Sequence, residues 1–275
     1  MITRVPMADR FKDKVAIVTG GSNGIGRAIM EELCKEGCAV AFTGISAAGE
    51  TTEAELKAEG WDVLFCRGDM SDEAFCKEIV DATLAKWGKI NYLVNNAFSF
   101  TAKGLDATRE DWERAFMVGP VGYSVMVQQC AEPMKAQGGG SIVNMSSISA
   151  FIAQPNRWTY NAAKGAVHTL TKCMALDLAP FNIRVNSISP AWIWTREVYK
   201  AADIDGGGRE KWDPIWGKFH MLRRCGEPVE CAGPTLFLLS DDASFVTGTD
   251  LAICGGYQAM GPEGLGEVSS FAGSE

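Results

Sequence analysis

Short apolar runs alternate with helix-like patterns along most of the sequence, and this alternation limits the folds that the chain can adopt. Seven runs of four to eight residues are largely apolar, as strands buried on both faces of a sheet are. The segments between them place apolar residues at helical spacing. The pattern predicts a parallel sheet of about seven strands with helices on both faces. The predicted strands are residues 14–20, 39–42, 63–66, 90–97, 141–147, 183–189 and 250–254.

Capping residues, glycines and prolines mark the predicted helix boundaries. Ser71 is the predicted N-cap of a helix that runs to about residue 87. A capping-box pattern at residues 108–111 opens a long helix, which the glycines at 138–140 end. A further helix ends before Pro180, because proline cannot continue a helix without losing a hydrogen bond.

The composition is that of an ordinary globular chain that can bury a core in one large domain. It has 275 residues, of which 47% are hydrophobic and 22% are charged. The formal net charge of -8 argues against a nucleic-acid partner, because phosphate binding needs a surplus of lysine and arginine, so we expect a small-molecule partner. We predict an N-terminal extension (1–10), one domain (11–258) and a Gly- and Ser-rich tail (259–275) that is flexible or packs against a partner chain.

Cysteines, histidines and the amino end favour a reducing compartment and no metal site. The nine cysteines are an odd number without a CxxC pair, which suits the cytosol better than a disulfide framework. The chain has two histidines, so a His-rich metal site is not expected. Residues 1–14 lack the apolar core of a signal peptide, and no run approaches the roughly 18 apolar residues of a membrane span. We therefore expect a cytoplasmic protein without a membrane partner.

Residues 192–227 depart from the alternation, because the apolar pattern loses its period there. The segment also holds the flexible glycines at 206–208, and we predict that it forms a lid over a binding site. Its tryptophans admit two interpretations, stacking on a substrate ring or packing within the lid. They are Trp192, Trp194, Trp212 and Trp216.

The segment TGGSNGIG, residues 19–26, joins the first predicted strand to the first predicted helix. Glycines let the backbone turn sharply and approach a ligand, and the amide groups of a helix N-terminus favour negative charge. Such a turn can be a mere connection, but after an apolar strand near the start of an alternating chain it favours a dinucleotide pyrophosphate. The predicted cofactor contacts in this turn are Gly20, Ser22, Asn23, Gly24, Ile25 and Gly26.

Tyr160 and Lys164 stand four residues apart in YNAAK, at the start of a predicted helix. Four residues are just over one helical turn, so the two side chains point to the same side. An ammonium near a phenol lowers the phenol pKa from its usual value of about 10, which would make Tyr160 a usable acid and base. The same spacing occurs by chance in many helices, so its meaning depends on the surrounding motifs.

These motifs, in this order over residues 11–258, resemble the short-chain dehydrogenase/reductase family, whose members form a single doubly wound Rossmann domain. The glycine turn matches the family's TGxxxGxG, NNA at 95–97 its fourth-strand motif, and YNAAK its YxxxK. Ser147 lies thirteen residues before Tyr160, as the catalytic serine does in the family. Residues 190–195 resemble its PGxxxT motif.

The resemblance implies hydride transfer between a secondary alcohol and a carbonyl, with NAD or NADP as the cofactor. Tyr160 would act as acid and base, and Ser147 would hold the substrate oxygen. Lys164 would keep the phenolate accessible and bind the nicotinamide ribose. Ser147 also has an ordinary interpretation, as a satisfied hydroxyl at a strand end. Tyr160 and Lys164 would also contact the cofactor, and Asp69 would contact its adenine. The further cofactor contacts that the family pattern implies are Gly44, Asp69, Met70, Asn96, Ala97, Pro190, Ile193 and Thr195.

Three positions depart from the family pattern. Phe98 replaces the usual glycine of NNAG, and Ala191 replaces the glycine of the Pro-Gly pair. The asparagine that usually follows Trp112 by seven residues, at a helix kink that holds a proton-relay water in the family, is Gly119 here. Proline removes an amide donor and clashes with the preceding turn, so Gly119 and Pro120 predict a kink without the asparagine.

The choice between NAD and NADP stays open. An acid at the end of the second strand would bond the ribose hydroxyl of NAD, and an arginine there or in the glycine turn would accept the phosphate of NADP. The sequence has Thr43, Gly44, Ile45 and Asn23 at these places, which do neither.

We expect a sugar, a sugar acid or a cyclic polyol as substrate. Arginines such as Arg196 and Arg209 are available for an anionic group. The alternative function is a nucleotide-binding sensor or scaffold with impaired turnover, which the departures at Phe98 and Gly119 suggest. The resemblance also implies a homotetramer. The predicted substrate contacts are Phe98, Ser147, Tyr160, Trp192, Trp194 and Arg196.

Overall fold

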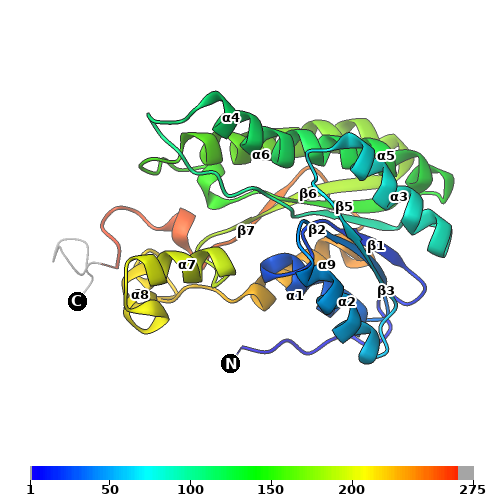
Figure 1. Ribbon diagram of the computed structural model, residues 1–275, viewed down its shortest axis with the longest axis horizontal. Helices are drawn as coiled ribbons and strands as arrows, with labels where there is room; N and C mark the ends of the chain where they lie inside the picture. Colours follow the sequence, from blue (N-terminus) through cyan, green and yellow to red (C-terminus); the bar gives the residue numbers. More distant parts are fainter. Residues whose placement is uncertain (1, 266–275) are drawn as a thin grey trace.

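All seven strands pair in one parallel sheet in the computed structural model, which describes residues 2–265. The strand order is β3-β2-β1-β4-β5-β6-β7, so the order reverses at β1, whose neighbours are β2 and β4 (Figure 1). The last ten residues of the predicted tail lie outside the described residues. The strands are β1 (Val15–Val18), β2 (Ala39–Gly44), β3 (Val63–Arg67), β4 (Tyr92–Asn95), β5 (Gly140–Met145), β6 (Ile183–Pro190) and β7 (Asp250–Ile253).

Helices cover both faces of this sheet, so the predicted doubly wound fold is confirmed (Figure 1). One face carries α1 (Gly24–Lys35), α2 (Ala48–Ala58) and α9 (Pro228–Leu239). The other carries α3 (Glu73–Trp87), α4 (Arg109–Phe116), α5 (Gly122–Ala136) and α6 (Trp158–Leu178). In the described part of the chain, no helix is long and apolar enough to span a membrane.

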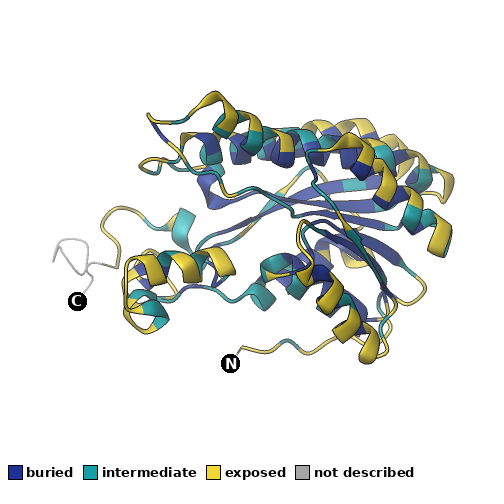
Figure 2. Cartoon of the chain, in the orientation of Figure 1, coloured by how far each residue is buried: buried dark blue, intermediate teal, exposed yellow. Residues whose placement is uncertain are grey.

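The apolar strands are explained by two cores, one on each face of the sheet (Figure 2). Successive side chains of a strand point to opposite faces. Ala16 and Val18 of β1 therefore join the core beneath α1 and α9, whereas Ile17 joins the core beneath α3, α5 and α6. Since each full burial of such a side chain contributes about 1.5–3 kcal/mol, a strand between two cores is apolar at most positions.

The start of α3 differs from the prediction by one residue. Asp72, not Ser71, is the N-cap, and its carboxylate accepts a hydrogen bond of 2.9 Å from the backbone amide of Ala74. The hydroxyl of Ser71 is engaged with Asp69, at 2.8 Å. Both residue types cap helices well, so this competition was not visible in the sequence.

The long helix predicted from residue 108 to about 134 is divided into α4 and α5. The predicted capping box is present, because Thr108 and Asp111 each accept a hydrogen bond from the backbone amide of the other. A π-helical turn, Met117–Val121, separates the two helices, and Gly119 leaves helical geometry with ψ of -112°. The kink that Gly119 and Pro120 predicted is therefore confirmed.

The segment predicted to be a lid contains two helices that the sequence analysis did not predict. They are α7 (Arg196–Ile204) and α8 (Gly208–Gly217), joined by glycines with positive φ at residues 206–208. Both helices are short, and α8 contains Pro214. Neither therefore has an apolar repeat long enough for a helix to be predicted from the sequence. They lie together at one end of the molecule, beside the carboxyl ends of the strands (Figure 1).

Candidate active site

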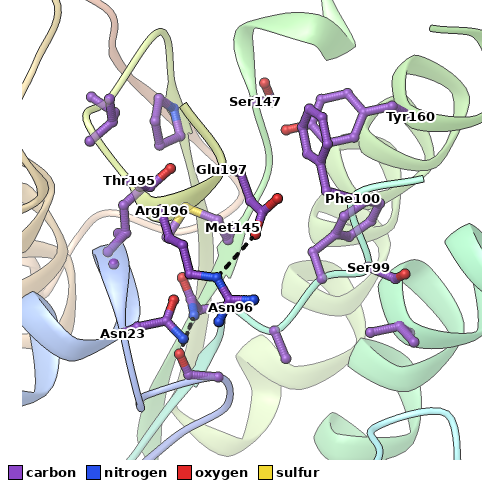
Figure 3. A pocket seen from close by; sticks show the side chains of 18 of the residues that line it. Asn23, Asn96, Ser99, Phe100, Met145, Ser147, Tyr160, Thr195, Arg196 and Glu197 are labelled. Atoms are coloured by element: carbon purple, nitrogen blue, oxygen red, sulfur yellow. Dashed lines mark hydrogen bonds and ion pairs between the residues drawn. The ribbon is translucent and has the colours of Figure 1, made fainter. Parts of the chain in front are cut away.

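A cleft of about 630 Å³ lies at the carboxyl ends of the strands, where the strand order reverses between β1 and β4. Doubly wound sheets bind their ligands at this place. The cleft brings together most residues that the sequence singled out for a cofactor and for chemistry (Figure 3). They are Gly20, Ser22, Asn23, Gly24, Ile25, Gly44, Asp69, Met70, Asn96, Ala97, Ser147, Tyr160, Lys164, Pro190, Ile193 and Thr195.

Two glycines of the turn are required by close backbone packing. Gly20 has a φ of +67°, and an added Cβ would lie 2.9 Å from the Cα of Ala97. A Cβ on Gly26 would lie 2.4 Å from both the carbonyl oxygen of Gly20 and the Nδ2 of Asn96. Gly26 was predicted as a cofactor contact, but it does not line the cleft; it lets α1 approach the turn.

The turn is tied to the NNA motif after β4 by the side chains of Thr19 and Asn96. The Nδ2 of Asn96 donates to the Thr19 carbonyl at 2.9 Å. The backbone amides of Asn96 and Ala97 both donate to the Thr19 hydroxyl, at 2.9 and 3.0 Å. The floor of the cleft is therefore held by satisfied hydrogen bonds on both sides of the switch point.

The N-terminus of α1 opens onto the cleft with the polarity that a pyrophosphate needs. Asn23 is its N-cap residue, its side chain makes no capping hydrogen bond, and the first turn of α1 contains no acidic residue. Free amide groups and the helix dipole therefore favour an anion here. This donor set fits the pyrophosphate of NAD or NADP.

Asp69 lies in the cleft after β3 as an ordered carboxylate. It accepts hydrogen bonds from the backbone amide of Ser71 at 2.9 Å and from the guanidinium of Arg114 at 2.7 Å. Partial burial raises its pKa, but the bonds from Ser71 and Arg114 outweigh burial and hold the pKa below its ordinary value. Asp69 is therefore ionised at neutral pH and can accept a hydrogen bond.

The end of β2 carries no charge. Thr43, Gly44, Ile45 and Ser46 line this part of the cleft beside Asn23. Neither a carboxylate for a ribose diol nor a cation for a ribose phosphate stands among these four residues, so they do not select between NAD and NADP.

The hydroxyl groups of Ser147 and Tyr160 lie next to each other in the cleft (Figure 3). Burial raises the pKa of Tyr160, while the hydrogen bond with Ser147 and the charge of Arg157 act in the opposite direction. The net effect is a raised pKa, so the prediction that Lys164 lowers the pKa of Tyr160 is wrong for this structure. Tyr160 holds its proton at neutral pH.

Lys164 is buried on the same face of α6, with 2% of its surface exposed. Its ammonium donates to the carbonyl of Met145 at 2.7 Å and lies 5.8 Å from the ring centroid of Tyr160. The ammonium is therefore held by strand β5 rather than by the tyrosine. Burial lowers the pKa of Lys164 to about 7, so the lysine loses its charge before Tyr160 ionises.

Two phenylalanines from the loop after β4 pack against Tyr160. The ring of Phe98 stands perpendicular to that of Tyr160 at 5.3 Å between centroids, and the ring of Phe100 lies at 4.9 Å. Both line the cleft. The substrate end of the cleft is therefore apolar on the side of this loop.

The predicted substrate contacts in the lid separate into two groups. Trp192 and Arg196 line the cleft, whereas Trp194 is 3% exposed and does not. The indole of Trp194 donates to Asp213 at 2.6 Å within the lid. For Trp194 the packing interpretation is therefore correct.

A continuous stack of indoles runs from the cleft into the lid. Trp192 stacks on Trp216 with 4.8 Å between ring centroids, and Trp216 stacks on Trp212 at 5.0 Å. Arg209, expected to be free for an anion, instead donates to Glu227 and to the hydroxyl of Tyr199. Apart from Trp192, these side chains build the lid and do not contact the cleft.

Arg157 is the main residue of the cleft that the sequence analysis missed. Its guanidinium lies over the ring of Phe100 at 5.4 Å, and within the described part of the chain no carboxylate pairs with it. Its position, three residues before Tyr160 at the start of the same helix, was the available signal. Gln154, Phe100 and Ser46 also line the cleft and were not predicted.

A glycine turn at the switch point of a parallel sheet, with a Ser-Tyr-Lys group in the same cleft, is typical of dinucleotide-dependent oxidoreductases. A family model described as enoyl-(acyl carrier protein) reductase matches residues 20–258. The chain belongs to the short-chain dehydrogenase/reductase family and is an oxidoreductase. Among the residues that the structure describes, no three His, Cys, Asp or Glu side chains are placed to hold a metal ion.

Known proteins with related sequences and structures cover nearly the whole chain. Cyclopentanol dehydrogenase of Comamonas sp. (strain NCIMB 9872) is 37% identical over 252 residues, which are 91% of this chain and 99% of that protein. The NADP-dependent (R)-specific alcohol dehydrogenase of Lentilactobacillus kefiri is 39% identical over 92% of this chain and 100% of its own length. The structure of Thermoplasma acidophilum aldohexose dehydrogenase matches with a TM-score of 0.85 and 35% identity, over 93% of this chain and 98% of that one.

Proposed function

We propose that the protein uses NAD or NADP to interconvert a secondary alcohol and a carbonyl on a sugar, a sugar acid or a cyclic polyol. The observation that carries this proposal is the placement of the Ser147 and Tyr160 hydroxyls together, beside Lys164, in the cleft that the glycine turn opens. Relatives that act on cyclopentanol and on an aldohexose support a ring-shaped substrate.

The proposed chemistry assigns one role to each of the three side chains. A nicotinamide cofactor bound in the cleft would supply the hydride in reduction and accept it in oxidation. In reduction, Tyr160 would donate its proton to the carbonyl oxygen, and Ser147 would hold that oxygen by a hydrogen bond. In oxidation the same proton returns from the alcohol to the Tyr160 phenolate. Tyr160 is protonated at neutral pH, which is the form that reduction needs.

The cleft also offers the groups that would hold the cofactor. The amides at the start of α1 would bind the pyrophosphate, and Asp69 would accept from the adenine. Lys164 has three donors, of which one is engaged with Met145, so others remain for ribose hydroxyls.

The test of this function is a panel of ring alcohols, sugars and sugar acids, assayed with NAD and NADP in parallel. Reduction of the nicotinamide with at least one cyclic alcohol is the expected result. Tight cofactor binding without turnover across the panel would favour the alternative, a nucleotide-binding sensor or scaffold.

Arg157 is expected to select substrates that carry an anionic group. Replacing Arg157 with leucine should lower kcat/KM for a ring alcohol with a carboxylate about 10- to 100-fold, because a hydrogen bond to a charged group contributes about 1.5–3 kcal/mol. The kcat/KM for the neutral analogue should change less than about threefold on the same scale. Arg157→Lys, which keeps the charge, is the matched control. An equal loss of kcat/KM for both substrates would show that Arg157 does not bind the anionic group.

We also propose a cytoplasmic homotetramer with α4 and α6 in a subunit interface. Apolar side chains on this side of the molecule support an interface, since Met117 is 36% exposed and Trp158 is 53% exposed. Light scattering is expected to give four times the chain mass of 29.6 kDa, and a monomeric mass would contradict the proposal.

A further inference from the structure

Phe98, the bulky residue after the NNA motif, packs against the buried ammonium of Lys164. The Nζ of Lys164 lies 4.1 Å from the centroid of the Phe98 ring, within the range of a cation–π interaction. The same ring stands edge-on to Tyr160, so it contacts two of the three side chains that are proposed to perform the reaction. Phe98 is therefore placed to influence where the ammonium sits.

The Phe98 ring also lies directly against the backbone of Gly119. A Cβ added to Gly119 would lie 2.7 Å from the Cε2 of Phe98 and 3.3 Å from its Cδ2. Real Cβ atoms do not approach other atoms so closely, so any side chain at position 119 would displace the ring. Gly119 forms part of the kink between α4 and α5, and the kink and the ring therefore fit each other as a pair.

The ammonium of Lys164 depends on Phe98 and Gly119 because it has few other partners. Within residues 2–265, its one hydrogen bond goes to the Met145 carbonyl, and no carboxylate pairs with it. A buried cation requires compensating contacts, and an aromatic face contributes more when water is excluded. The Tyr123 ring is farther away, at 5.9 Å. The nearest aromatic face to the ammonium is that of Phe98.

We propose that Phe98, seated on Gly119, is a positioning residue that holds the ammonium of Lys164 between its ring and the Met145 carbonyl. The inference rests on the proposed function only in the role of Lys164 toward the cofactor ribose. The two departures from the family pattern are then linked, since the large residue at 98 requires the smallest residue at 119. The ring, and not a polar side chain from the kink, fixes the lysine.

The test is a double-mutant cycle with Phe98→Gly, Gly119→Asn and the double variant, read by kcat, by KM and by the dissociation constant of NAD(P)H from its fluorescence. With Phe98 present, Gly119→Asn should weaken NAD(P)H binding and kcat at least tenfold, because the displaced ring releases Lys164. In the Phe98→Gly background the same substitution should change both less than threefold. Additive effects in the cycle would overturn the proposal.

Phe100→Gly is the matched control for this cycle. Phe100 comes from the same loop and packs on Tyr160 at 4.9 Å, but the three atoms nearest to a Cβ on Gly119 all belong to Phe98. Its combination with Gly119→Asn should therefore be additive. If Gly119→Asn does not fold, Gly119→Ala probes the same contact with a single added atom.

A pH profile separates positioning from simple packing. The titratable groups that face Lys164 are Tyr160 on α6 and Tyr123 on α5, and Arg157 acts on Tyr160 from the start of α6. Activity that needs the charged lysine falls as the pH rises through the lysine pKa, which is about 7. Phe98→Leu keeps the site dry but removes the ring face, so the fall in activity should occur at lower pH. Phe98→Gly admits water, so the fall in activity should occur at higher pH. If the pH of this fall were unchanged in both variants, Phe98 would fill space without positioning the lysine.

NAD(P)H binding and turnover, measured separately, distinguish the role of Phe98 from the proposed dehydrogenase function. A coupled cycle in NAD(P)H binding without turnover on any substrate would support the positioning role and contradict the dehydrogenase. Turnover with an additive cycle would do the reverse.

Discussion

Replacing Tyr160 with phenylalanine is expected to lower kcat in both directions by about 10²–10⁴-fold, the usual contribution of a positioned acid and base. The variant loses the one hydroxyl that lies beside Ser147 and can exchange a proton with the substrate oxygen. The ring itself remains, so the packing of Phe98 and Phe100 against it is preserved. Steady-state kinetics in both directions, with the NAD(P)H dissociation constant measured separately, would check this result.

Tyr123→Phe is the matched control for Tyr160→Phe. Tyr123 is buried, its hydroxyl has no hydrogen-bond partner among the described residues, and it does not line the cleft. The same chemical change should therefore alter kcat less than about threefold. Full activity of Tyr160→Phe on a genuine substrate would exclude Tyr160 as the acid and base.

Replacing Gly26 with alanine is expected to lower the free energy of unfolding by about 1–3 kcal/mol and to weaken NAD(P)H binding at least tenfold. The added Cβ would lie 2.4 Å from the Gly20 carbonyl and from the Asn96 amide nitrogen. Both atoms belong to the network that holds the glycine turn, so α1 must move away and carry its N-terminus out of position. Chemical denaturation and NAD(P)H fluorescence measure the two effects.

Gly165→Ala is the control for the glycine substitution. Gly165 lies within α6 next to Lys164, and a Cβ there meets no atom within 4 Å. Alanine should therefore stabilise the protein by about 0.5–1 kcal/mol through helix propensity, without weakening cofactor binding. If Gly26→Ala were as stable as Gly165→Ala, close packing at the turn would not be the reason for that glycine.

The strands and the order of the motifs were predictable because a strand that is buried on both faces is a continuous apolar run in the sequence. Ile17 and its neighbours on β1 are each apolar because they face two cores. The strands β5 and β6 also bury polar residues, such as Ser141, Asn144 and Asn186, each with a hydrogen-bond partner. The glycine turn and the Tyr160–Lys164 pair were readable for a similar reason, since backbone approach and helical spacing are local constraints. The kink was predictable from the neighbouring Gly119 and Pro120.

The errors concern properties that depend on neighbours distant in the sequence. Whether Trp194 faces the cleft or the lid depends on Asp213, nineteen residues away, which accepts its indole hydrogen. The pKa of Tyr160 depends on how deeply the side chain is buried and on its hydrogen bond with Ser147, thirteen residues away. Neither α7 nor α8 is long enough to establish a repeat in the sequence.

The indole stack of the lid gives the enzyme a built-in optical signal. Four of its eight tryptophans lie in residues 192–227, and Trp192 connects the cleft to Trp216 and Trp212 by ring stacking. A ligand that contacts Trp192 changes the polarity around one end of this stack, and a shift of α7 or α8 changes its geometry. Emission from these indoles is therefore expected to change when a ligand contacts Trp192 or when α7 and α8 shift, and a stopped-flow experiment on the unlabelled protein would measure the change.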